Sequence, residues 1–101
     1  MPVSQTSPAA LANINGVLMP LAEATVPALD RGFLFGDAVY EVLRVYQGKP
    51  WLLKEHLNRL AYSLNAVRIQ GVGLERLQER MRATITAGPF GEATVYIQIT
   101  R

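Results

Sequence analysis

Two consecutive segments with helical periodicity, flanked by segments with strand periodicity, are the feature that most restricts how this chain can fold. Residues 54–68 and 74–87 repeat apolar side chains every three or four positions, the spacing of a helix with one buried stripe. Residues 38–46 and 94–101 instead alternate as strands do. A chain of 101 residues has room for one hydrophobic core, so both kinds of element must share it. The pattern predicts an α+β domain, with two helices packed on an antiparallel or mixed sheet.

The other segments read as shorter elements. Asn15-Gly16 suits a tight hairpin turn, because both residues readily adopt positive φ. Residues 1–10 are rich in Ser, Pro and Ala, and we expect them to be a disordered tail ahead of a domain that spans 11–101. The remaining expectations are a hairpin over 11–19, an irregular connection over 20–29, a packed loop over 30–37, a turn over 47–50 and a returning strand over 51–53.

The strand predicted over 38–46 has polar residues on both of its faces. One face carries Tyr40, Val42, Arg44 and Tyr46, and the other carries Val39, Glu41, Leu43 and Val45. A strand with one simple solvent face would separate polar from apolar residues. We therefore expect one face to pack on the core and the other to line a partly polar space such as a pocket.

Charge and composition exclude several classes of protein. Ten basic and eight acidic residues give a net charge of +2 without a basic run, so no nucleic-acid partner is expected. The absence of cysteine excludes disulfides, thiolate metal sites and a cysteine nucleophile. No segment has the features of a signal peptide or the ~20 apolar residues of a membrane span, so we expect a cytoplasmic protein without a membrane partner.

Few side chains could carry chemistry on their own. His56 and Arg59 lie three apart on the first predicted helix, off its apolar stripe. An arginine there either binds an anion or lies in solvent, and spacing alone leaves both open. A lone histidine favours a structural role over a metal site, and no metal is expected. Lys49 and Lys54 lie in a turn and at a helix start, where we expect them to be solvated.

Two motifs resemble a known family. The first is Asp30-Arg31-Gly32-Phe33-Leu34-Phe35-Gly36-Asp37-Ala38-Val39-Tyr40-Glu41-Val42, and the second is His56-Leu57-Asn58-Arg59-Leu60. Their order and spacing resemble the N-terminal domain of class IV (fold-type IV) pyridoxal 5'-phosphate (PLP) aminotransferases. The first motif and the final strand are most similar to the D-amino-acid transaminase branch.

The resemblance implies roles for particular residues. Arg59 would bind the PLP phosphate, and Tyr40, Val42 and Arg44 would face the substrate pocket. Phe33 would also lie at the pocket, where the D-amino-acid enzymes often carry a tyrosine, and this departure leaves the substrate open.

No catalytic residue is expected within the chain itself. The Schiff-base lysine of the family would follow Arg101, in a C-terminal domain, and neither Lys49 nor Lys54 matches it. The last predicted strand runs to Arg101 without a turn or polar tail, so we expect the chain to end at a boundary inside a longer protein. The chain alone should therefore be inactive.

The resemblance also implies a function for the longer protein. It would be a homodimer that transfers an amino group between a small amino acid, with a D-alanine-like substrate favoured, and a 2-keto acid. Within the family the alternatives are a branched-chain aminotransferase and an aminodeoxychorismate lyase. Outside it, the chain would be a non-catalytic α+β interaction module.

Overall fold

The computed structural model describes residues 10–101. The tail expected over residues 1–10 therefore lies almost entirely outside the described residues. The elements in chain order are β1 (Leu11–Ile14), β2 (Val17–Pro20), a 3-10 turn η2 (Leu21–Glu23), α1 (Arg31–Phe35), β3 (Ala38–Tyr46), β4 (Lys49–Pro50), α2 (Leu53–Ala66), α3 (Leu74–Ala87) and β5 (Glu92–Thr100).

The strands form two antiparallel sheets, which confirms the α+β class. β3 lies between β4 and β5 in one sheet, and β1 and β2 form a separate hairpin. The hairpin turns at Asn15 and Gly16, whose φ values of 54° and 93° are those that the Asn-Gly pair predicted. It is anchored on α3, because Asn13 Nδ2 donates to Arg80 O (3.3 Å) and Thr84 Oγ1 (3.1 Å).

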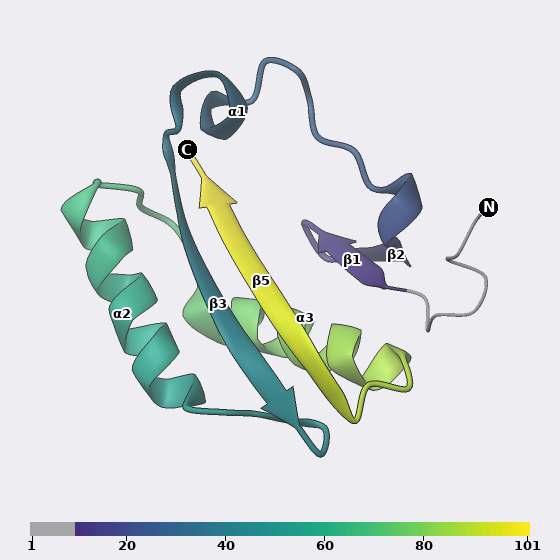
Figure 1. The fold of residues 1–101 in the computed structure, drawn as a ribbon. Coiled ribbons are helices and arrows are strands. Elements are labelled where there is room, and N and C mark those ends of the chain that lie inside the picture. The colour runs from purple at the N-terminus through teal and green to yellow at the C-terminus, as the bar shows by residue number, and fades with distance from the viewer. Residues whose placement is uncertain (1–9) are drawn as a thin grey trace.

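The core lies between the larger sheet and its two long helices. α2 runs beside β3 on the side away from β5, and α3 crosses behind the sheet (Figure 1). The core-facing side chains of β3 and β5 pack on both helices and on the segment between them. The buried apolar residues are Val39, Leu43, Val45, Leu60, Leu64, Ile69, Met81, Ile85 and Ile97. The helical and strand periodicities of the sequence thus meet in one core, as predicted.

The segment 30–37 differs from the packed loop that the sequence predicted. Its central residues form the short helix α1, because the Asp30 carboxylate accepts the Gly32 N–H (2.8 Å) and caps the first turn. Gly36 ends the helix in the left-handed region, with φ 65°. The side chains of Phe33 and Phe35 are exposed (72% and 68%), so the aromatic residues of this segment do not pack inside the domain.

The charged residues of this segment attach α1 to the far end of β5. Asp37 Oδ2 accepts hydrogen bonds from Arg31 Nε (3.0 Å) and Arg101 Nε (2.8 Å). Thr100 Oγ1 donates to Asp30 Oδ2 (3.2 Å). The contacts of Asp37 with Arg101 and of Asp30 with Thr100 join residues 64 and 70 positions apart and fix the entry into β3.

The returning strand is shorter than predicted and lies earlier in the sequence. β4 covers only Lys49–Pro50, and residues 51–52 form a turn instead of continuing the strand predicted over 51–53. The reason is local, because Leu52 adopts φ 55° and cannot extend a strand before α2 begins at Leu53. Among residues 10–101, β4 pairs with the outer edge of β3 only at Val45 and Tyr46, and α2 lies along the rest of that edge (Figure 1).

Candidate functional site

A carboxylate lies within the core-facing side of β3. Glu41 alternates with the buried residues Val39 and Leu43, and only 4% of its surface is exposed. A carboxylate removed from water needs hydrogen-bond donors, because an unpaired buried charge is strongly unfavourable. The donors must come from an element that covers this face, and α2 provides them.

His56 and Arg59 approach the carboxylate together because one helical turn separates them on α2. Arg59 donates from Nε to Glu41 Oε2 (2.8 Å) and from Nη2 to Glu41 Oε1 (2.9 Å). His56 Nδ1 lies 2.7 Å from Oε1, and a carboxylate can only accept, so the imidazole N–H donates. Glu41, His56 and Arg59 form one hydrogen-bonded cluster. Within it His56 has a structural contact, because it donates to the buried carboxylate.

The guanidinium of Arg59 is only partly used by this cluster. Arginine has five N–H donors, and Glu41 takes one on Nε and one on Nη2, so both N–H groups of Nη1 and one of Nη2 remain. The Arg59 side chain is 65% exposed. A guanidinium edge with two parallel donors matches the geometry of a phosphate or carboxylate. The cluster can therefore bind an anion on its solvent side.

The contact between Glu41 and Arg59 favours the ionised form of both side chains. The hydrogen bond from Arg59 lowers the pKa of Glu41 below its ordinary value, and the His56 hydrogen bond acts in the same direction against the opposing effect of burial. The same contact with Glu41 raises the pKa of Arg59. At neutral pH the pair is consequently a carboxylate and a guanidinium.

The exposed face of β3 presents three of the residues that the family resemblance would place at a substrate pocket. Tyr40, Val42 and Arg44 alternate outward while their neighbours face the core. Tyr40 stacks on Tyr96 of β5 with ring centroids 5.7 Å apart, and Arg44 Nη1 donates to Thr94 Oγ1 (2.7 Å). The outer face of β3 thus carries aromatic residues and one cation and is exposed, and the pocket that we expected it to line stays a prediction.

The predicted site residues do not all come together within the described chain. Tyr40, Val42 and Arg44 share one face of β3, whereas Arg59 contacts the strand through Glu41 on the other face. Phe33 lies on a separate element, α1. Sequence reasoning missed Glu41 and Tyr96, although a charged residue on the core-facing side of a strand was a signal that could have revealed the first.

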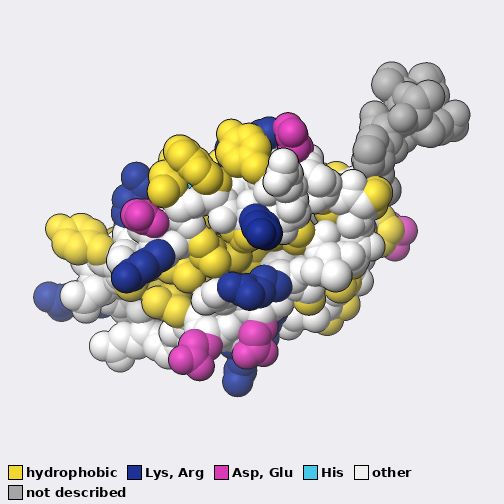
Figure 2. All heavy atoms as spheres, turned by 90° about the horizontal axis from the view of Figure 1, so that it is seen from below, with side chains coloured by type: hydrophobic (Ala, Val, Ile, Leu, Met, Phe, Trp, Pro, Cys, Tyr) yellow, Lys and Arg dark blue, Asp and Glu magenta, His cyan; other side chains and the backbone are white. Residues whose placement is uncertain are grey.

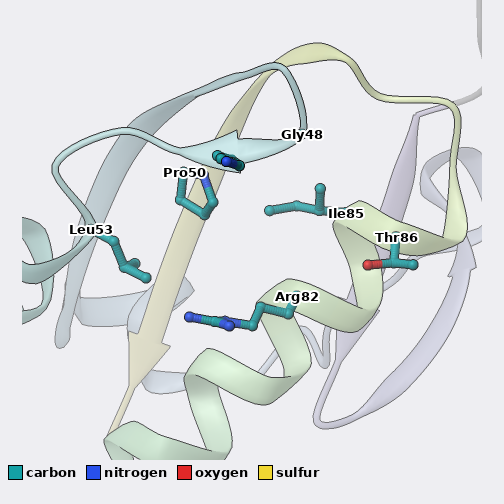
Figure 3. Close-up of a pocket in the computed structure, with 7 residues that line it drawn as sticks. Gly48, Pro50, Leu53, Arg82, Ile85 and Thr86 are labelled. Carbon is teal, nitrogen blue, oxygen red and sulfur yellow. The ribbon is translucent and has the colours of Figure 1, made fainter.

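A surface hollow lies away from this cluster. It has a volume of about 490 Å³ and is lined by Gly48, Lys49, Pro50, Leu53, Arg82, Ile85 and Thr86. Figure 3 shows Pro50 and Leu53 on one side of it and side chains of α3 on the other. Hydrophobic side chains gather in the middle of the molecule's lower face, with basic and acidic side chains around them (Figure 2). The hollow contains none of the predicted site residues.

The two lysines lie on the surface, as predicted. Lys49 is in β4 and Lys54 in the first turn of α2, and both are exposed. Within residues 10–101 no group of three or more potential metal ligands occurs. No helix in the same part of the chain is long and apolar enough to span a membrane.

These features define an α+β domain that presents an arginine fork beside its central strand, and the chain is similar in sequence to known proteins. The family described as Amino-transferase class IV matches residues 38–101. D-alanine aminotransferase of Staphylococcus aureus is 36% identical over 89 residues, which cover 87% of this chain and 32% of that protein. The chain therefore belongs to the class IV aminotransferase family.

Solved structures agree with this assignment. A fold IV transaminase from Curtobacterium pusillum has a TM-score of 0.76 at 29% identity, covering 84% of this chain and 31% of that one. A 4-amino-4-deoxychorismate lyase from Pseudomonas aeruginosa has a TM-score of 0.70 at 31% identity, covering 77% and 28%. The chain spans about a third of the length of the curated relatives that it matches.

Proposed function

We propose that this chain is the N-terminal part of a PLP-dependent aminotransferase that moves an amino group between a small, D-alanine-like amino acid and a 2-keto acid. The observation that carries the proposal is the Arg59 fork, which Glu41 holds along one edge and which keeps a second edge for an anion. It belongs to the family-like His56-Leu57-Asn58-Arg59-Leu60 motif, inside the matched residues.

In this proposal the chain binds and orients, and the reactive group lies elsewhere. The free donors of Arg59 fit the phosphate of PLP, since a guanidinium edge pairs with two phosphate oxygens. When bound, PLP supplies the electron sink for breaking bonds at the amino acid's α-carbon. Tyr40, Val42 and Arg44 form one wall of the substrate pocket, and Phe33 borders it.

Lys49 and Lys54 do not take part in this chemistry. A lysine that carries the cofactor needs an apolar or cationic setting that lowers its pKa, whereas both of these are exposed. We propose that the cofactor-bearing lysine lies in a further domain of a protein about three times as long, consistent with the share of the relatives covered. The chain alone is then inactive. The same resemblance supports a cytoplasmic homodimer.

An activity assay of the polypeptide encoded by the whole gene tests which substrate the protein uses. Purified with PLP, it should convert D-alanine and a 2-keto acid to pyruvate and a new amino acid, faster than it uses L-leucine. Elimination of pyruvate from aminodeoxychorismate is the second candidate, which the similarity to the Pseudomonas aeruginosa lyase favours. Many turnovers of pyruvate release from aminodeoxychorismate without a keto-acid acceptor would select the lyase, because transamination without an acceptor stops after one equivalent per site. No reaction with any of the three substrates would refute the proposal.

A further inference from the structure

Glu41 is the buried group that contacts Arg59, and it lies on the core-facing side of β3. We propose that Glu41 is a positioning residue: it fixes the Arg59 guanidinium so that the edge formed by Nη1 and Nη2 faces the cofactor phosphate, while His56 holds the carboxylate. The inference rests on the proposed phosphate-binding role of Arg59.

The rigid part of this arrangement is the sheet. β3 pairs with β5 along its whole length, from Ala38↔Thr100 to Tyr46↔Glu92, so the backbone at Glu41 is held in place. The carboxylate is 4% exposed and accepts three hydrogen bonds, from both nitrogens of the Arg59 edge and from His56. The sheet therefore holds Glu41 in place, and the two hydrogen bonds from Arg59 to Glu41 hold the guanidinium in place.

Arg59 needs this support because little else holds it. Its side chain is 65% exposed, and a free arginine samples many rotamers. An anion that binds a mobile arginine must first order it, and immobilising one such side chain weakens binding by about two- to twelvefold. Glu41 orders the guanidinium before the anion arrives.

The carboxylate does not take the donors that the anion needs. It contacts the Nε and Nη2 atoms, which form the side edge of the guanidinium. The end edge, Nη1 with the second N–H of Nη2, stays free, and a phosphate there can still form two parallel hydrogen bonds. One arginine thus bridges a buried carboxylate and an external anion.

The test compares PLP with pyridoxal, which lacks the phosphate, on the apo form of the whole protein. Glu41→Gln keeps the shape of the side chain but replaces Oε2 or Oε1 with an N–H donor that opposes Arg59. We expect it to raise the PLP dissociation constant about two- to twelvefold and to leave the pyridoxal constant unchanged. Glu55→Gln, an exposed glutamate in the first turn of the same helix, is the control and should change neither.

A double-mutant cycle shows whether Glu41 acts through Arg59. In an Arg59→Ala background, Glu41→Gln should no longer weaken PLP binding. Equal or tighter PLP binding by Glu41→Gln, an equal loss for pyridoxal, or an undiminished effect in the Arg59→Ala background would each overturn the inference. If Glu41→Gln does not fold, Glu41→Asp takes its place, because it keeps the charge but draws the oxygens back by one methylene, and it should weaken PLP binding in the same selective way.

The Arg59→Ala variant distinguishes a failure of the Glu41 inference from a failure of the proposed function. If Arg59→Ala binds PLP as tightly as the wild type, the phosphate role of Arg59 is wrong, whatever Glu41 does. If Arg59→Ala weakens PLP binding while Glu41→Gln and Glu41→Asp do not, Arg59 binds the phosphate without the help of Glu41.

Discussion

Removing the charge of Glu41 should destabilise the domain by an amount that depends on pH. In Glu41→Gln the remaining amide oxygen can still accept from His56 and from Arg59 Nη2, as Oε1 does now, but the amide nitrogen then faces Arg59 Nε, which is also a donor. One charge-assisted hydrogen bond to the buried carboxylate is lost, which is worth about 1.5–3 kcal/mol. We expect the lower end of this free-energy range, because the Arg59 donors that lose their partner are exposed and hydrogen-bond to water instead. We expect a loss of about 1.5 kcal/mol, or about 6–12 °C in Tm.

The direction of the pH dependence follows from the lowered pKa of Glu41. A carboxyl whose pKa is lower in the folded than in the unfolded chain stabilises the fold above its unfolded pKa. That contribution is lost as the pH falls through the folded pKa. The part of the stability difference that comes from the ionised Glu41 carboxylate should therefore be fully present above the ordinary glutamate pKa of 4.5 and shrink below it.

Urea denaturation followed by circular dichroism between pH 3 and 7 measures this difference. Glu55→Gln should stay within about 0.5 kcal/mol of wild type throughout, because Glu55 is exposed. Asp37 also has a lowered pKa, mainly through its hydrogen bond with Arg31, but it is present in all three proteins and cancels in the comparison. Equal stability of wild type and Glu41→Gln at pH 7, or a difference that does not shrink in acid, would refute the reasoning.

Three further changes test the fold and the chemistry. Leu60→Ala removes a fully buried side chain (0% exposed) and should cost about 2–5 kcal/mol in urea denaturation; a loss under 1 kcal/mol would contradict the core assignment. Gly32→Ala would place a methyl group against Thr100, so we expect a loss of about 1–3 kcal/mol, and a more stable variant would show that α1 does not pack there. Borohydride reduction of this chain with one equivalent of PLP should give no stoichiometric label on Lys49 or Lys54 in peptide mapping, beyond the low labelling of any exposed amine; stoichiometric labelling of either would place the cofactor-bearing lysine here.

The sequence by itself determined the elements whose signal is local. The alternation over 38–46 predicted β3 with its correct bounds, and the helical spacing over 74–87 did the same for α3. Asn15-Gly16 predicted the first hairpin, because the turn needs two residues that tolerate positive φ. Each of these patterns depends on neighbours within one element, so no knowledge of the fold is needed.

The tertiary structure decided everything that depends on distant partners. The short helix α1 formed where a packed loop was predicted, since the Asp30 cap and the contact with Thr100 hold it. The hairpin became a sheet of its own, because it packs on α3 instead of joining β3.

The same distinction applies to the candidate site. Spacing placed Arg59 off the apolar stripe of α2, and from the sequence alone we would predict that Arg59→Ala leaves the fold intact. The structure revises this prediction, because Glu41, 18 positions earlier, is buried beneath Arg59 and would keep only His56 as a donor. Sequence periodicity shows which face of each element is apolar, but the pairing of a charge on one face with a charge on another depends on how the elements pack.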